Sequence, residues 1–135
     1  MSSSIDVMTI YYDSLADGDL ETVTDCFDIP SKLISLYGVV DMSNRDDILR
    51  TYTDLIESWK EQGISKRIGY DKDTFEISRI QENIDMVKTK LTNHDLNGNF
   101  LQKWDCTYVL RNESNKWLIS LATTNNQSSK TMRNY

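Results

Sequence analysis

Hydrophobic positions near the start of the chain recur with the period of an α-helix. Between residues 5 and 16 they are spaced by three or four, which predicts an amphipathic helix ending at Asp17-Gly18. Its hydrophobic face consists of Met8, Tyr11, Tyr12 and Leu15. Asp19 is a typical N-cap of a second, short helix, which residues 28–30 should end because proline cannot continue a helix. The inward positions of this second helix are Leu20, Val23 and Phe27.

The longest helical pattern begins at the cap residues 43–47. Two short apolar runs precede it, at residues 33–36 and 39–42, and predict a small hairpin around Tyr37-Gly38. Hydrophobic positions then follow at i, i+1, i+4, i+7, i+8 and i+11, which predicts a helix of about five turns that ends at Gly63. These positions are Ile48, Leu49, Tyr52, Leu55, Ile56 and Trp59.

The remaining sequence alternates between polar and hydrophobic positions and predicts four strands, at about 66–80, 84–96, 100–111 and 116–125. Their turns set the expected registers. Asn97-Gly98 is a two-residue hairpin signal that pairs Leu96 with Asn99. The same register pairs Leu91 with Trp104, Thr89 with Cys106, Val87 with Tyr108 and, on the other face, Lys90 with Asp105.

The other two turns predict registers of the same parity. A loop at residues 112–115 pairs Arg111 with Lys116, and therefore Leu110 with Trp117. A three-residue turn at residues 81–83 pairs Ile77 with Val87 and Glu76 with Lys88. Because a slip of one residue would mix the two faces of the sheet, this agreement supports the registers.

One face of the predicted sheet is hydrophobic, and the helices should pack against it. This pattern predicts an α+β fold with helices on one side of a curved, mostly antiparallel sheet. The hydrophobic face consists of Phe75, Ile77, Val87, Leu91, Phe100, Trp104, Cys106, Tyr108, Leu110, Trp117, Ile119 and Leu121. The opposite face is a mixture of small and apolar side chains, which favours a homodimer formed around a two-fold axis. The expected contact residues are Met86, Thr107, Val109, Leu118, Ser120 and Ala122.

Composition and charge narrow the function. The 135 residues should form one domain, 1–135, with its core at about 5–124 and a polar tail at 125–135. Fifteen basic and 21 acidic residues give a formal net charge of −6, which argues against a nucleic-acid partner. We recognise neither a signal peptide nor a membrane span, and expect a cytoplasmic protein. Cys26 and Cys106 should be buried free thiols. The sequence contains no cluster of Cys and His residues, so we expect neither a metal nor a cofactor.

The segment 12–20, with the pattern Y..L..GDL, resembles the opening of the nuclear-transport-factor-2-like superfamily, also called SnoaL-like or cystatin-like. Phe27, residues 44–48 and residues 111–119 are similar to it as well, and the resemblance spans about residues 5–124. It implies a cone-shaped half-barrel with the order α-α-β-β-α-β-β-β-β, whose sheet wraps the long helix. It also implies a pocket at the wide end for a hydrophobic or amphipathic small molecule. Members include isomerases, dehydratases, cyclases and scaffolds, so the fold alone does not set the function.

The resemblance also indicates where catalytic groups would stand. In the ketosteroid-isomerase pattern Tyr11 would donate a hydrogen bond to an oxyanion, a base would lie near Ser35 and a second acid near Cys106 or Tyr108. Neither place has a carboxylate. The acidic and His residues that follow the last Trp in SnoaL-like cyclases are replaced here by residues 120–123, Ser-Leu-Ala-Thr. We therefore expect a domain without catalysis.

Three residues remain weak catalytic candidates: Tyr11, Tyr12 and Asp73. Asp73 is on the inner parity near the start of its predicted strand, where it is either a base with a raised pKa or a solvated strand end. His94 and Asp105 are on the outer parity, and Asp105 pairs with Lys90. An isomerase, lyase or cyclase that uses a pocket carboxylate with a tyrosine is the alternative function, and a protein-interaction scaffold is another.

Aromatic and polar side chains of the inner face should line the expected pocket. A few polar groups in an apolar cavity are typical of a small-ligand site. The alternative is that the aromatic side chains fill the cone. The expected pocket residues are Tyr12, Tyr52, Trp59, Thr89, Gln102, Trp104, Cys106, Tyr108, Trp117 and Thr123.

Overall fold

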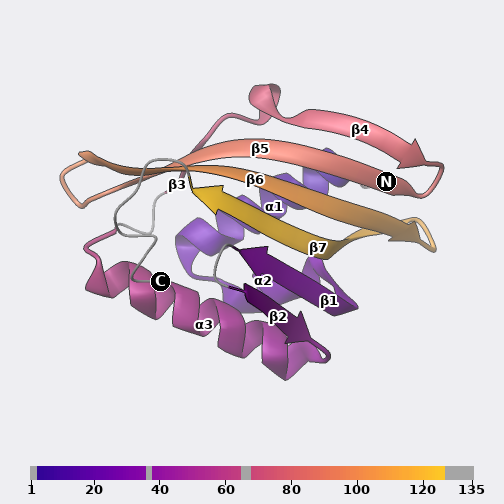
Figure 1. Ribbon diagram of the computed structural model, residues 1–135, viewed down its shortest axis with the longest axis horizontal. Helices are drawn as coiled ribbons and strands as arrows, with labels where there is room; N and C mark the ends of the chain where they lie inside the picture. Colours follow the sequence, from indigo (N-terminus) through magenta and orange to yellow (C-terminus); the bar gives the residue numbers. More distant parts are fainter. Residues whose placement is uncertain (1–2, 36–37, 65–67, 127–135) are drawn as a thin grey trace.

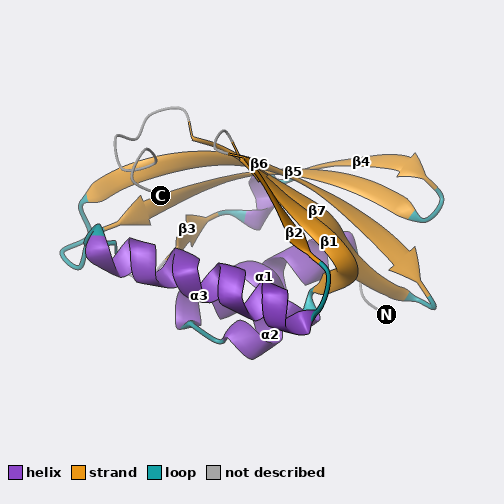
Figure 2. Cartoon of the chain, turned by 60° about the horizontal axis from the view of Figure 1, so that its bottom comes forward, coloured by secondary structure: helices purple, strands orange, loops and turns teal. Residues whose placement is uncertain are grey.

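The computed structural model describes residues 3–35, 38–64 and 68–126. Its helices and strands form two layers, with α1, α2 and α3 on one side of a curved, open sheet of seven strands (Figures 1 and 2). This α+β architecture is the predicted one. No helix in the described part of the chain is long and apolar enough to cross a membrane.

The helices begin at the predicted caps. Helix α1 (Ser4–Asp17) has a capping box between Ser3 and Asp6, and ends at Gly18, whose φ of 75° suits a residue without a side chain. Asp19 caps α2 (Leu20–Asp25), and Asn44 caps α3 (Arg45–Glu61) by accepting the backbone N–H of Asp47. The predicted faces of α1 and α3 are buried or half-buried, as expected of amphipathic helices.

Phe27 is the first residue of a strand, so its predicted place on the second helix is wrong. Strand β1 (Phe27–Ser35) passes through residues 28–30, pairs antiparallel with β2 (Gly38–Met42), and pairs parallel with β7 (Lys116–Asn126). Pro30 is tolerated there because it lies between Phe27 and Lys32, where the register of the parallel pair is irregular. The predicted hairpin between β1 and β2 is confirmed, although residue 37 lies outside the described residues.

The predicted strand at residues 66–80 is divided. It contains β3 (Ile68–Tyr70), the 3-10 turn η1 (Lys72–Thr74) and β4 (Glu76–Gln81). Asp71 causes the break, because its side chain accepts the backbone N–H of Asp73 and begins the turn. Both β3 and β4 pair with β5 (Ile84–His94), which pairs in turn with β6 (Phe100–Glu113). The order of the strands across the sheet is β2-β1-β7-β6-β5-β3, and β4 lies off this path beside β5.

The register between β5 and β6 is the predicted one, with Leu91 opposite Trp104 and Lys90 opposite Asp105. The turn itself differs. The N–H of Asp95 donates to the carbonyl of Asn99, so the loop is one residue longer than predicted, and an irregularity between Asn93 and His94 restores the register. The predicted pairing of β4 with β5, Ile77 with Val87, is also confirmed.

The register between β6 and β7 was predicted wrongly. Ser114 and Asn115 have φ of 55° and 65° and form a tighter turn, so that Leu110 pairs with Ile119 in place of Trp117. Ser120 is then an extra residue that reverses the faces of β7. As a result Ala122 points into the core, fully buried, and Leu121 lies on the outer face opposite Val109, the reverse of the prediction.

The core lies between the helices and the concave face of the sheet. Trp104 and Trp117 are both buried, as predicted for the hydrophobic face. Ile77 and Phe100 are exposed although they were placed on this face, because Ile77 is on the edge strand β4 and Phe100 is the first residue of β6 beside a turn. Both predicted free cysteines are buried.

Candidate functional site

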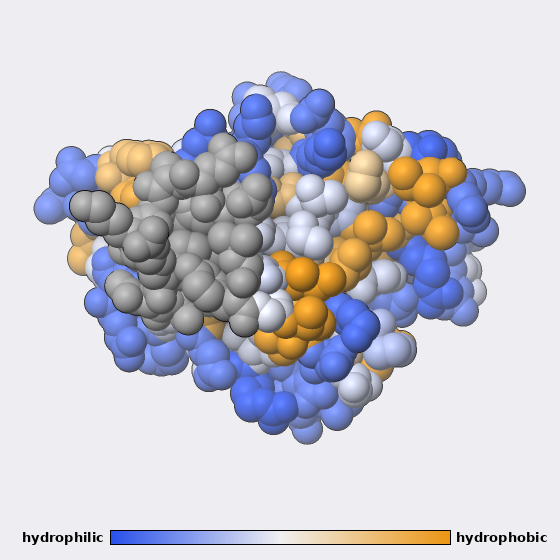
Figure 3. Space-filling view, in the orientation of Figure 1, coloured by the Kyte–Doolittle hydropathy of each residue, from blue (hydrophilic) through white to orange (hydrophobic). Residues whose placement is uncertain are grey.

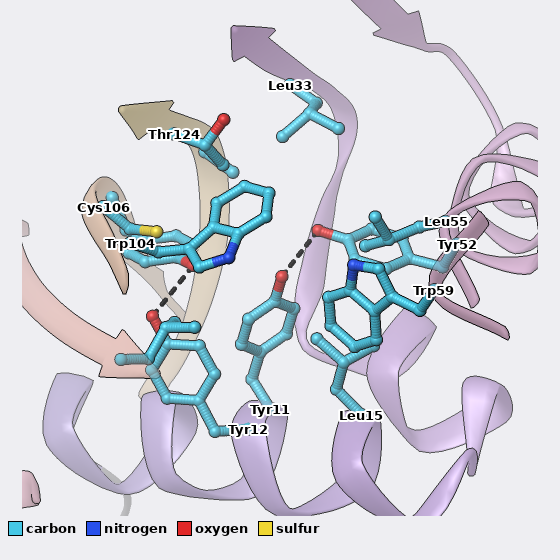
Figure 4. A pocket seen from close by; sticks show the side chains of 13 residues that line it. Tyr11, Tyr12, Leu15, Leu33, Tyr52, Leu55, Trp59, Trp104, Cys106 and Thr124 are labelled. Carbon is cyan, nitrogen blue, oxygen red and sulfur yellow. Dashed lines mark hydrogen bonds between the residues drawn. The ribbon is translucent and has the colours of Figure 1, made fainter. Parts of the chain in front are cut away.

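A hollow lies between α1, α3 and the concave face of the sheet (Figure 4). The space open to the centre of a water-sized sphere is about 40 Å³. Its walls are almost entirely apolar, and they come from α1, α3 and the strands β1, β5, β6 and β7. The residues that line this cavity are Tyr11, Tyr12, Leu15, Leu33, Tyr52, Leu55, Trp59, Leu91, Trp104, Cys106, Tyr108, Ala122 and Thr124.

Paired tyrosine hydroxyls from the helices and the sheet lie at the cavity. The hydroxyl oxygens of Tyr11 and Tyr52 are 2.7 Å apart, so α1 is joined to α3. Tyr12 contacts Thr89 at 2.6 Å and donates to the hydroxyl of Tyr108 at 2.9 Å, so α1 is also joined to β5 and β6. Burial raises the pKa of Tyr11, Tyr12 and Tyr108 well above 10.0, so all three phenols are neutral hydrogen-bond donors at neutral pH.

Two tryptophans line the cavity, and their indole N–H groups differ in whether they have a hydrogen-bond acceptor. Trp104 donates to Oε1 of Gln102 at 2.6 Å, and the amide of Asn93 donates to the same oxygen at 3.0 Å. Trp59 is 5% exposed, and its Nε1 has no hydrogen-bond partner within the described part of the structure. Figure 4 shows this nitrogen on the side of the ring near the Tyr11–Tyr52 pair. The wall residue Trp59 therefore carries a buried donor that has no acceptor among the described residues.

The ionisable groups of the cavity walls are tyrosines and one thiol. Among the residues described there, none is a carboxylate or a histidine. Burial raises the pKa of Cys106 to about 12, so its thiol is protonated and a poor nucleophile at neutral pH. No group of His, Cys, Asp and Glu side chains in the described ranges could hold a metal ion. Such walls can bind an apolar molecule and donate hydrogen bonds to it, but they offer no base for proton transfer at neutral pH.

The weak candidate Asp73 lies away from this site. It is exposed in η1, and it is absent from the described walls of the cavity. The inward parity of its predicted strand does not apply because residues 72–74 are not extended. Tyr11 and Tyr12 do face the cavity, so the structure brings together the two tyrosines of the alternative enzyme but not its carboxylate.

Six of the ten expected pocket residues line the cavity, namely Tyr12, Tyr52, Trp59, Trp104, Cys106 and Tyr108. The other four have different places. Thr89 and Gln102 are buried behind the walls, where they hold Tyr12 and Trp104. Trp117 is buried beneath the guanidinium of Arg79, which is 5.4 Å from its ring centroid. Thr123 is on the outer side because of the extra residue Ser120, and Thr124 lines the cavity in its place.

The sequence analysis did not place Leu33, Ala122 or Thr124 at the cavity. The last two depend on the irregularity at Ser120, which the pattern of the strand did not reveal. A buried carboxylate, Asp85, was also missed. The register that pairs Ile77 with Val87 pairs Arg79 with Asp85 as well, and this opposite-charge pair was the available signal.

The sequence of residues 6–127 matches the family described as NTF2-like protein (DUF6841). The chain belongs to this NTF2-like family. No curated protein matches it.

Solved structures with low sequence identity share the fold. A protein of unknown function with a cystatin-like fold from Nostoc punctiforme has a TM-score of 0.74 and 14% identity, over 93% of this chain and 89% of that one. A ketosteroid isomerase-like protein from Erwinia carotovora has a TM-score of 0.70 and 13% identity, over 90% and 92%. A candidate dehydratase of the NTF2-like family from Streptomyces avermitilis has a TM-score of 0.69 and 14% identity, over 91% and 93%. At these identities the likeness concerns the fold alone.

Proposed function

We propose that this NTF2-like protein binds a small, mostly apolar molecule in the cavity and does not transform it. The observation that carries the proposal is the unpartnered N–H of Trp59 in an otherwise apolar, aromatic-walled hollow. A buried donor without an acceptor costs about 1–3 kcal/mol, and a ligand oxygen that displaces the groups packed against Trp59 Nε1 would remove that cost. The walls described above hold neither a carboxylate nor a histidine, which supports binding without catalysis.

The size of the cavity is compatible with a small ligand. Its volume of about 40 Å³ counts only the positions open to the centre of a water-sized sphere, whereas one water fills roughly 10–15 Å³ of occupied volume. That volume is traced by sphere centres, so the hollow extends one water radius further on every side and accommodates a group such as an aromatic ring. The ligand we propose is therefore a compact apolar group with one hydrogen-bond acceptor.

A pair of probes that differ by one oxygen tests this proposal. We expect 4-ethylphenol to bind the full chain more tightly than ethylbenzene in calorimetric titrations at pH 7, because only the phenol offers an acceptor to Trp59. Trp59→Phe should remove most of this preference. Ala122→Val should weaken both probes, because Ala122 is fully buried in the cavity wall.

The control is Thr107→Val, which introduces the same side chain on the outer side of β6, away from the cavity. This variant should bind both probes like the unchanged protein. The proposal is wrong if neither probe binds saturably, or if Ala122→Val and Thr107→Val bind them equally. Circular dichroism of each variant establishes that it is folded.

We also propose that a second copy of the chain covers the outer face of the sheet. Hydrophobic surface crosses the middle of this face (Figure 3). Met86, Val109 and Leu121 are register partners on three adjacent strands and form one half-buried row, with Leu118 nearby. Thr107 and Thr123 beside the row are uncharged, and Lys88, the partner of Thr107 on β5, is exposed, so two copies related by a two-fold axis would keep this charge at the margin of the row. Ala122 is not part of this surface, because it points into the core.

Light scattering coupled to gel filtration tests the dimer. We expect twice the chain mass of 15.7 kDa for the unchanged protein and a monomer for Val109→Lys, since a charge in the apolar row opposes the contact. Thr92→Lys, on the same face of β5 but outside the row, is the control and should remain dimeric. A monomer at all concentrations in the unchanged protein would exclude this interface.

A further inference from the structure

A second hollow adjoins the cavity on the outside of the molecule. This groove lies between β2 and α3 and has a volume of about 310 Å³. Its lining residues are Leu33, Val40, Asp41, Asp47, Arg50, Thr51, Asp54, Leu55 and Ser58. Leu33 and Leu55 line the cavity as well, so these two side chains stand between the two hollows. An elongated molecule could therefore occupy both.

The two leucines form an apolar partition, which is the passage that a ligand spanning both hollows must cross. Figure 4 shows Leu33 and Leu55 on the side of the cavity opposite Tyr12. Leu33 is buried on β1, whereas Leu55 is half-buried on α3. A molecule that spans both hollows requires another rotamer of Leu55, a change that involves the side chain and not the backbone of α3.

The groove is acidic. Its walls carry three aspartates and one arginine among the described residues. Asp41 pairs with Lys32, and Asp47 accepts from the guanidinium of Arg50, so both charges are compensated. Asp54 is exposed and has no ion pair with any residue in the described ranges. This uncompensated carboxylate, in a chain with a net charge of −6, favours a cation in the groove.

A second observation points to a ligand that reaches the cavity beyond the passage. The indole N–H of Trp59 is buried in the cavity wall and has no acceptor in the part of the chain that the structure describes, and Trp59 follows Leu55 by one turn of α3. The two hollows thus favour different groups at the two ends of one molecule. The cavity offers a donor in apolar surroundings, and the groove offers a negative charge in water.

We infer that the ligand is a small aryl-alkyl amine whose ring carries an oxygen acceptor. The ring enters the cavity between Leu33 and Leu55 with its oxygen toward Trp59, and the ammonium group lies in the groove beside Asp54. This inference rests on the proposed function, because it names the chemical class of the molecule bound at that same site.

Three probes with the same phenol ring separate the contribution of the charged group from that of the ring. Tyramine carries the ammonium group, 4-ethylphenol lacks it, and 3-(4-hydroxyphenyl)propanoate carries a carboxylate in its place. In calorimetric titrations of the full chain at pH 7 and low ionic strength, we expect tyramine to bind about threefold to fivefold more tightly than 4-ethylphenol, the modest gain of an exposed charge pair. The propanoate should bind more weakly than both, and added salt should reduce these differences.

Asp54→Asn should abolish the advantage of tyramine over 4-ethylphenol and leave the affinity for 4-ethylphenol unchanged. The matched control is Glu57→Gln, which removes the same charge from the same helix outside the groove. It should keep the tyramine advantage.

If 4-ethylphenol binds but tyramine gains nothing, the amine inference is wrong and the proposed function stands. If Asp54→Asn and Glu57→Gln reduce the advantage equally, the net charge of the chain attracts the amine and the groove does not seat it. If no probe binds, the proposed function itself is excluded.

Discussion

The hydroxyl of Tyr11 on α1 lies 2.7 Å from the hydroxyl of Tyr52 on α3, inside the core. Both side chains are at most 4% exposed, so water does not replace a lost partner at the protein surface. Tyr52→Phe should therefore lower the free energy of unfolding by about 1 kcal/mol, measured by urea denaturation.

The double variant checks that the loss comes from this contact. Tyr11→Phe with Tyr52→Phe should cost less than the sum of the two single changes, because either single change already removes the contact between the two hydroxyls. Additive losses would contradict a direct hydroxyl pair. Tyr70→Phe, whose hydroxyl bonds the exposed Asp13, is the control and should have a smaller effect.

Stability should decrease steeply at alkaline pH because the core groups are difficult to ionise. Burial raises the pKa of Cys106 from 9.0 to about 12, and raises the pKa of Tyr11, Tyr12 and Tyr108 well above 10.0. In the unfolded chain these groups release protons near pH 9 and 10, so the unfolded state binds fewer protons than the folded one above that range. Their contribution to stability is complete below pH 9 and is lost as the pH rises through the folded-state values.

Spectroscopy distinguishes this linkage from simple titration. We expect the absorbance of the buried tyrosinates to increase at the same pH at which the near-ultraviolet dichroism is lost, in one cooperative step. Thiol reagent at pH 8 should leave Cys106 unmodified in the folded protein. Ionisation of Tyr11, Tyr12 and Tyr108 near pH 10 with the dichroism intact would contradict their burial.

The turn between β6 and β7 is a site at which the protein can be stabilised. Asn115 has a φ of 65°, a conformation that glycine adopts without steric cost. Asn115→Gly should raise the free energy of unfolding by about a few tenths of a kcal/mol, because the relief at positive φ is partly offset by the greater entropy of glycine in the unfolded chain. The control Asn112→Gly, in β6 opposite Trp117, should destabilise the sheet instead. A destabilising Asn115→Gly would argue against this turn and its register.

The sequence predicted the elements and the core better than the local irregularities of the sheet. The periodicity of Met8 to Leu15 and of Ile48 to Trp59 is repeated over several turns, so a helix was strongly indicated. A single extra residue such as Ser120 leaves no such pattern, yet it reverses every side chain that follows it in β7. The sequence therefore placed Trp104 correctly and placed Ala122 on the wrong face.

In the candidate site, too, residues on regular helices were predicted better than features that depend on local structure. Tyr12, Tyr52 and Trp59 were expected at the pocket because they lie on the hydrophobic faces of two strongly predicted helices. The unpartnered N–H of Trp59 could not be expected, since it depends on which acceptors the fold brings within reach. Asp73 illustrates the opposite error, because strand parity was applied to a residue in a turn.

Asp85 shows how a buried carboxylate can act in structure rather than catalysis. Its side chain is 3% exposed, accepts a hydrogen bond of 2.7 Å from the hydroxyl of Ser4 at the start of α1, and pairs with Arg79 on β4. Asp85→Ala should lower the free energy of unfolding by about 2–3 kcal/mol, because it leaves buried polar groups unpaired and removes one link between the start of α1 and the sheet.

Asp41→Ala is the matched control for Asp85→Ala. Asp41 also pairs with a basic residue, Lys32, but its side chain is 66% exposed, so the same substitution should cost less than about 1 kcal/mol. Urea denaturation gives both values, and hydrogen exchange at the N-terminal end of α1 locates the effect. Since Asp85 is absent from the described walls of the cavity, Asp85→Ala should bind 4-ethylphenol normally at temperatures at which it is folded. Equal losses of stability in the two variants would mean that burial of Asp85 does not set its contribution.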